Sequence, residues 1–217
     1  VETRELDGFS IIEDYWLEEP YSLAEILKNE ESGENRYRVE EPDLSGREQR
    51  MMRAIWEELR DRLPYEKISE DKHKILRENF MDIVEEHGIN EQTTMHKILY
   101  YLVRNNLDYG KITPLMKDES IEDISCDGVD VPIYIYHRDY YNLRTNLSFN
   151  EEEINTFVTR LAEKCGEHIS YANPVVESKL PDGSRLQATL GSEVTTKGSS
   201  FTIRKFKGGT FTPVDLI

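Results

Sequence analysis

Two arginines near the end of the chain are the residues whose chemistry stands out. Arg185 follows a tight Asp-Gly turn, and Arg204 precedes Lys205 on a later predicted strand. A guanidinium group is planar, stays charged and suits bidentate contact with phosphate. On adjacent antiparallel strands the two arginines would converge on one anion. The spacing leaves a second interpretation open, in which each arginine is an exposed strand cation that contributes little.

Other kinds of chemistry find no support in the residue pattern. The sequence has no GxxxxGK[ST] phosphate loop, no GxGxxG after a strand and no HExxH. The histidines, which lack metal-ligand spacing, are His73, His87, His96, His137 and His168. Cys165 and His168 could form a thiol and base, but one turn at a helix end explains their spacing equally well. We therefore expect no metal site, and no ATP hydrolysis by these residues alone.

The composition excludes several classes of protein. The 217 residues include 43 acidic against 27 basic ones, a net charge of −16. This charge disfavours a general nucleic-acid binder, because phosphate backbones need a basic surface. No apolar run approaches the roughly 20 residues of a membrane span, and no secretory signal is recognisable. Cys126 and Cys165 lack CxxC spacing and are expected to be reduced thiols.

The charge is spread unevenly along the chain. Residues 1–45 hold 14 acidic and four basic side chains, whereas residues 166–217 hold five acidic and six basic ones. A phosphate group would therefore meet the chain in its last quarter. The acidic front either meets a basic partner or is a solvated surface, and the sequence leaves both open.

The elements that must position these groups change in type along the chain. Residues 1–44 are predicted as an acidic, extended or strand-containing front, with a short helix around 23–27 and a strand at 36–39. Beyond this front, apolar residues recur every 3.6 positions in three segments, so residues 45–109 are predicted as a small three-helix bundle. The predicted helix starts are Ser45, in a capping box with Glu48, then Ser69 and Asn90.

The period of the apolar residues changes from 3.6 to 2 after Gly110. Residues 110–207 are accordingly predicted as an α+β sheet domain, with one amphipathic helix that starts at Ser148 and covers one face. A turn at 181–183 precedes the strand that carries Arg185. The predicted strands are 121–126, 133–136, 140–144, 174–180, 184–190 and 201–206. The fold class expected for the whole chain is α+β.

The last ten residues, 208–217, are predicted to be a linker followed by the start of another domain. Gly208-Gly209 is typical of a flexible joint, and Thr212-Pro213 is typical of the first positions of a helix. A helix this short is not stable alone. We therefore expect the sequence to be part of a longer polypeptide.

Several motifs, taken in order, resemble the N-terminal domain of type II/IV secretion-system ATPases. They are Pro114-Leu115-Met116, Ile121–Ile124, Cys126–Gly128, Pro132–His137, Pro174–Glu177, Leu180–Ala188, Ser199–Phe206 and Thr212-Pro213. The resemblance is closest to the archaeal branch, which drives assembly of the archaellum and of type IV pili. The front is also similar to archaeal members, at Trp16–Tyr21 and Tyr37–Pro42.

The resemblance implies a PAS-like, sandwich-like N-terminal domain of a hexameric motor. In that family the domain closes over ATP and Mg²⁺, which a C-terminal ATPase domain with a phosphate loop binds. Arg185 and Arg204 match the family's arginines that face the γ-phosphate, and Lys205 and Phe206 are expected beside the nucleotide.

The resemblance also implies a place and partners in the cell. The expected location is cytoplasmic, peripheral at the membrane, where the homo-hexamer moves a polytopic membrane platform protein; no nucleic-acid partner is expected. The alternative is a free-standing adapter or sensor module without enzymatic activity.

Overall fold

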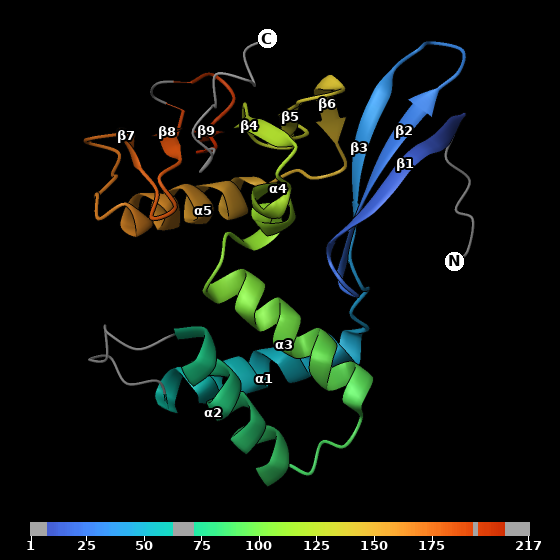
Figure 1. The fold of residues 1–217 in the computed structure, drawn as a ribbon. Helices are drawn as coiled ribbons and strands as arrows, with labels where there is room; N and C mark the ends of the chain where they lie inside the picture. Colours follow the sequence, from blue (N-terminus) through green and yellow to red (C-terminus); the bar gives the residue numbers. More distant parts are fainter. Residues whose placement is uncertain (1–7, 63–71, 193–194, 207–217) are drawn as a thin grey trace, which may run out of the picture. The chain divides into compact units, whose positions relative to one another are not determined.

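The computed structural model describes residues 8–62, 72–192 and 195–206 (Figure 1). These residues form five α-helices, one short 3₁₀ helix and nine strands, which confirms the α+β fold class. The chain divides into two compact units that interleave along the sequence. Unit 1 takes residues 1–15, 24–39 and 118–217, and unit 2 takes residues 16–23 and 40–117. The independence of three consecutive regions, with boundaries after residues 44 and 109, stays a prediction.

The strands form one mixed sheet in the order β1-β2-β3-β6-β5-β4-β9-β8-β7. Their bounds are β1 Phe9–Glu18, β2 Ser22–Asn29, β3 Asn35–Glu40, β4 Ile121–Cys126, β5 Tyr134–His137, β6 Tyr141–Thr145, β7 Val175–Lys179, β8 Arg185–Thr189 and β9 Ser200–Arg204. Strand β3 pairs in parallel with β6, and the five pairings from β6 through to β7 are antiparallel. The strands predicted after residue 120 all occur.

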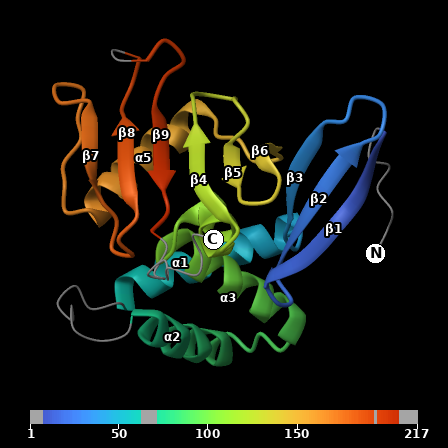
Figure 2. The same ribbon diagram turned by 45° about the horizontal axis from the view of Figure 1, so that its top comes forward.

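Helix α5, Glu151–Lys164, covers one face of this sheet, where it packs against β8 and β9 (Figure 2). Its N-cap is Asn150 rather than Ser148, because Asn150 and Glu153 form a complete capping box. The core between helix and sheet is apolar and buried; it includes Ile154, Phe157, Val158, Leu161, Leu186, Phe201 and Ile203. Alternate residues of β8 and β9 therefore face the core, and the others face solvent.

The predicted helix around residues 23–27 is wrong, because this segment lies in strand β2. Four consecutive residues, Ala24 to Leu27, are buried there. The carboxylate of Glu25 accepts a hydrogen bond of 2.5 Å from Nε of Arg38 on β3, so its buried charge is paired. A short apolar run does not distinguish a buried strand from a helix by its period. Pairing with the neighbouring strands of the sheet therefore determines that this segment is a strand.

Unit 2 is mainly helical. It contains α1 Gly46–Arg62, α2 Lys72–Glu86, α3 Gln92–Asn106, the 3₁₀ helix η1 Gly110–Ile112 and α4 Thr113–Lys117. Apolar side chains of α1, α2 and α3 share one buried cluster: Ile55, Leu59, Leu76, Phe80, Ile83, Val84, Ile98 and Leu102.

The starts of these helices test the predicted caps. The capping box of Ser45 and Glu48 is present, whereas α3 takes Glu91 and not Asn90 as its N-cap. The start predicted at Ser69 lies outside the described residues. No helix in the described part of the chain is both long enough and apolar enough to cross a bilayer.

A buried carboxylate ties together distant segments of unit 1. Asp118, which is 3% exposed, accepts hydrogen bonds from the hydroxyls of Tyr15 (2.6 Å) and Tyr37 (2.7 Å). The hydroxyl of Tyr15 also lies 3.4 Å from Nε2 of the buried His137. These contacts join β1, β3 and β5 to the residues that precede β4, because a buried charge needs such partners.

Candidate anion-binding site

The register of the sheet brings the two predicted arginines together. Strands β8 and β9 are adjacent and antiparallel, and Arg185 and Arg204 are directly opposite each other. Both side chains are exposed, since both alternate with buried residues that face α5. The two arginines therefore lie on neighbouring antiparallel strands, as convergence on one anion requires.

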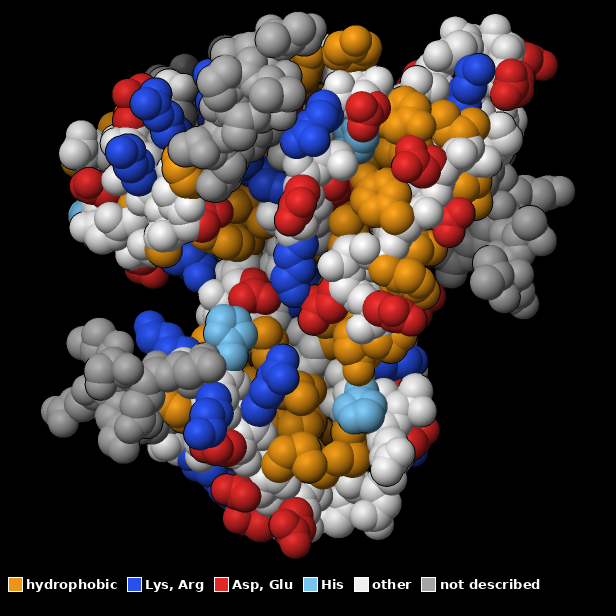
Figure 3. Space-filling model, in the orientation of Figure 1, with side chains coloured by type: hydrophobic (Ala, Val, Ile, Leu, Met, Phe, Trp, Pro, Cys, Tyr) orange, Lys and Arg blue, Asp and Glu red, His pale blue; other side chains and the backbone are white. Residues whose placement is uncertain are grey.

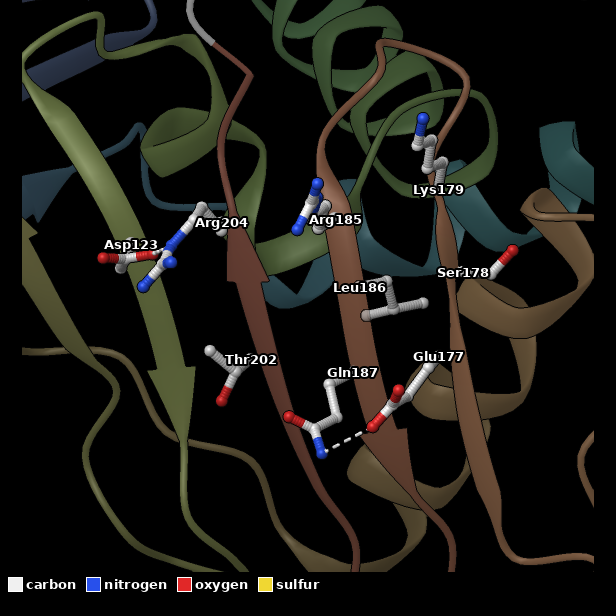
Figure 4. A pocket seen from close by; sticks show the side chains of 9 residues that line it. All are labelled: Asp123, Glu177, Ser178, Lys179, Arg185, Leu186, Gln187, Thr202 and Arg204. Atoms are coloured by element: carbon white, nitrogen blue, oxygen red, sulfur yellow. Dashed lines mark hydrogen bonds and ion pairs between the residues drawn. The ribbon is translucent and has the colours of Figure 1, made fainter.

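The same register adds a third cation that the sequence pattern did not single out. Lys179 on β7 is directly opposite Arg185, so Lys179, Arg185 and Arg204 stand side by side on three neighbouring strands. We call these three residues the cation row. Asp123 on β4 continues the row beyond Arg204. All four residues line one shallow depression of about 470 Å³ (Figure 4).

The turn between β7 and β8 sets the position of Arg185. Gly183 adopts φ +88°, a conformation that favours glycine, and its N–H donates to the carbonyl of Leu180. Asp182 accepts hydrogen bonds from both the N–H and the hydroxyl of Ser184. The Ser184 hydroxyl in turn accepts from the N–H of Phe206 at 3.1 Å. The start of β8 is thus held to the residues that follow β9.

The charges of the cation row are unequally compensated. Nε of Arg204 donates to Oδ1 of Asp123 at 2.9 Å, and this bond raises the pKa of Arg204 further above its usual value. Within the described part of the chain, Arg185 and Lys179 have no acidic partner. Like charges directly opposite each other on a sheet are destabilising. Three cations in register are therefore a feature that an anionic ligand would stabilise.

The two other predicted nucleotide residues, Lys205 and Phe206, do not join the cation row. The ammonium of Lys205 donates to the carbonyl of Asp118 at 2.5 Å, and burial lowers its pKa to about 8. Phe206 is 64% exposed and lies beside Gly183. Both residues line a second depression, which also includes Arg185 and Arg204. A direct role for Lys205 and Phe206 toward a nucleotide stays a prediction.

The remaining reactive groups give little sign of chemistry. Burial raises the pKa of Cys165, and it raises that of Cys126 to about 11, whereas a nucleophilic thiol needs a lowered pKa. Neither cysteine is in a disulfide. Among the described residues, no three His, Cys, Asp or Glu side chains gather as metal ligands would. The cation row is thus the candidate site.

Comparison with known proteins finds similar proteins in the archaeon Methanocaldococcus jannaschii. The family model described as "PilB3-like, N-terminal" matches residues 1–43. The uncharacterized protein MJ1288 of Methanocaldococcus jannaschii is 39% identical over 180 residues, which are 79% of this chain and 71% of that protein. MJ0900 of the same organism is 38% identical over 111 residues, 51% of this chain and 20% of that protein. MJ0781, also from this organism, is 31% identical over 118 residues, 54% of this chain and 16% of that protein.

One solved structure is similar at a lower level. It is the crystal structure of the VirB11 ATPase from the Brucella suis type IV secretion system in complex with sulphate, with a TM-score of 0.40 and 21% identity. The similarity covers 47% of this chain and 30% of the VirB11 chain. Identity and coverage are much higher for MJ1288. The chain therefore belongs to the same family as MJ1288, and its first 43 residues match the PilB3-like N-terminal family model.

Proposed function

We propose that this chain is the nucleotide-sensing N-terminal domain of a hexameric ATPase. The ATPase would drive either secretion or the assembly of a pilus or archaellum. In this proposal the domain closes over ATP held by an ATPase domain of the same polypeptide. The cation row then contacts the terminal phosphate, and the closing motion is passed to a membrane platform protein at the cytoplasmic face.

The observation that carries the proposal is the placement of Arg185 directly opposite Arg204 on an exposed sheet face. A guanidinium at the terminal phosphate would stabilise the negative charge that develops on the transferring phosphoryl group. Such arginines contribute about 10³–10⁵ in rate in other phosphoryl-transfer enzymes. The cation row therefore fits the phosphates of ATP.

The magnesium ion that accompanies ATP does not fit this face equally well. Mg²⁺ prefers carboxylate and water oxygens in octahedral geometry, together with substrate phosphates. The acidic side chain nearest the row, Asp123, is bonded to Arg204, and the described residues gather no set of metal ligands. In our proposal the ATPase domain holds the Mg²⁺.

The test uses a polypeptide in which this region is joined to its ATPase domain. Arg185→Ala and Arg204→Ala, made separately, should each lower ATP turnover by about tenfold or more, while the thermal midpoint stays near that of the parent. Arg138→Ala, at the turn between β5 and β6, removes the same charge away from the cation row and should leave turnover unchanged. If both row variants hydrolyse ATP as fast as the parent, the arginines are structural.

A second candidate function is a free-standing adapter or sensor without its own ATPase. The observation in its favour is that the 180 residues matched in MJ1288 make up 71% of that protein, whereas the 111 residues matched in MJ0900 make up 20% of that one. The gene sequence downstream of Ile217 separates the two candidates. A phosphate loop within about one domain length, roughly 100–150 residues, supports the motor. A stop codon directly after Ile217 supports the adapter.

A further inference from the structure

Asp123 holds the guanidinium of Arg204 on the side of β9 that faces away from Arg185. Its Oδ1 accepts the hydrogen bond from Nε of Arg204, and the two residues are direct partners on β4 and β9. In Figure 4 the Arg204 guanidinium lies beside the Asp123 carboxylate. An anion that bridges Arg185 and Arg204 must therefore compete with a carboxylate that belongs to the protein itself.

The pair is exposed enough to be exchanged for a ligand. The side chain of Arg204 is 73% exposed and that of Asp123 is 31% exposed. Exposed ion pairs of this kind contribute little to the stability of the folded protein, because solvent screens the charges and both side chains lose conformational freedom. A singly charged anion offers Arg204 no more than Asp123 already does. A polyphosphate carries several charges and also meets Arg185 and Lys179.

We propose that Asp123 is a built-in competing anion, which makes the cation row select multiply charged phosphates over singly charged anions. This inference rests on the proposed role of the cation row as an anion site. Asp123 would then determine specificity although its charge has the same sign as the ligand. A carboxylate at this position would otherwise only repel an anionic ligand. Removal of the charge should tighten binding of anions and reduce the selectivity for charge number.

The same sheet face supplies a matched control. Glu177 on β7 lines the same depression and carries the same charge, but its carboxylate accepts from the amide of Gln187 at 3.1 Å (Figure 4). Glu177→Gln therefore removes one negative charge from this face without freeing an arginine. Any difference between Asp123→Asn and Glu177→Gln isolates the competition for Arg204 from the general field.

The experiment measures binding of inorganic tripolyphosphate and of acetate to the 217-residue chain by titration calorimetry at low salt. Asp123→Asn should bind tripolyphosphate about three- to tenfold more tightly than the parent, and Glu177→Gln less than about twofold more tightly. Acetate binding should become measurable first in Asp123→Asn. Equal tightening by the two variants overturns the inference.

A second measurement separates competition from a simple charge effect. In an Arg204→Ala background, Asp123 has no guanidinium partner that its replacement could release. Asp123→Asn should then change tripolyphosphate affinity no more than Glu177→Gln does. The Nε–H resonance of Arg204 in NMR spectra should shift on addition of tripolyphosphate to the parent, as the bond to Asp123 is replaced. An undiminished effect in the Arg204→Ala background would contradict the inference.

The design also distinguishes this inference from the proposed function. If Arg185→Ala weakens tripolyphosphate binding but Asp123→Asn does not tighten it, the cation row is an anion site and Asp123 is a structural partner. If neither the parent nor Asp123→Asn binds tripolyphosphate, both the anion site and the inference fail.

Discussion

At the scale of single residues, the register between strands explains which residues of the candidate site could be predicted from the sequence and which could not. Arg185 and Arg204 could be singled out because Arg185 follows a recognisable turn and Arg204 is the first residue of a basic pair. Lys179 and Asp123 could not, because nothing in their spacing says which residues oppose them across the sheet. A shift of one residue would turn every side chain of a strand to the other face. The sequence thus predicted the strands that follow residue 120 and left their pairing open.

Lys179 provides a direct test of the cation row. Lys179→Met removes the charge but keeps the length of the side chain, and we expect tripolyphosphate to bind about three- to tenfold more weakly at low salt. Lys74→Met, an exposed lysine of α2 in the other unit, removes the same charge and should have little effect. Titration calorimetry makes the comparison, and equal affinities for the two variants would exclude Lys179 from the site.

The tyrosine hydroxyls around Asp118 predict how stability depends on pH. Burial, followed by the charge of Asp118, raises the pKa of Tyr37 far above its usual value near 10. The unfolded chain loses this proton from about pH 10 upward, while the folded protein keeps it. The free energy of unfolding should therefore hold up to about pH 10 and fall above it.

Urea unfolding between pH 7 and pH 11 measures this dependence. The urea midpoint should decrease more steeply above pH 10 in the parent than in Tyr37→Phe, which has no proton to lose at that position. The variant will be less stable at pH 7, because Asp118 loses a hydrogen-bond donor. A midpoint that stays constant to pH 11 in the parent would contradict the pKa shift.

At the scale of elements, periodic segments were predicted well and the short apolar segment was not. The amphipathic pattern of α5 and the alternation in β8 and β9 each indicate which face is buried, and the structure agrees. Strand β2 has a continuous buried run instead, so its sequence carries no period that separates strand from helix. Its partners, which lie in other segments, determine its structure.

The turn before β8 links the stability of an element to the site. A Cβ at position 183 would lie 3.3 Å from the ring of Phe206, and the φ of +88° is unfavourable for alanine. We expect Gly183→Ala to lower the free energy of unfolding by about 1 kcal/mol or more. Because the turn positions Arg185 against β9, tripolyphosphate affinity should fall as well.

Gly33→Ala is the control for this turn. Gly33 has a comparable φ of +70°, but a Cβ there meets nothing within 4 Å. Denaturant unfolding should show a loss of stability in both variants, since both strain the backbone. Tripolyphosphate binding should weaken in Gly183→Ala alone. If Gly33→Ala weakens binding to the same extent, the contact with Phe206 does not position the site.

At the scale of the whole molecule, acidic side chains are concentrated in the first 45 residues of the sequence, whereas the cation row lies in the last 52. The first 45 residues hold 14 acidic side chains, whereas the last 52 hold six basic ones, half of them in the cation row. On the face that Figure 3 shows, acidic and basic side chains are interspersed. A basic partner, such as a positively charged loop of a membrane protein, would be attracted to the acidic front.

Salt tests this attraction. Binding of a basic peptide to the chain should weaken by about tenfold or more between 50 and 500 mM salt, because the Debye length falls to a few ångströms. Replacing the exposed Glu30 and Glu31 with Gln in the turn after β2 should weaken binding at low salt and leave the fold intact. An affinity that does not change with salt or with these substitutions would direct attention to another surface.

The parallel pairing of β3 with β6 joins two strands that are synthesised at widely separated times. Arg36 is opposite Arg144, which leaves the ribosome 108 positions later. At about 5–20 residues per second, the strand at the front therefore waits roughly 5–20 seconds for its neighbour. The helices α1 to α3 are made during that interval, and their contacts are local enough to form at once. The nascent chain thus holds a finished helical segment while β3 still has an open edge, the period in which a chaperone would have most to protect.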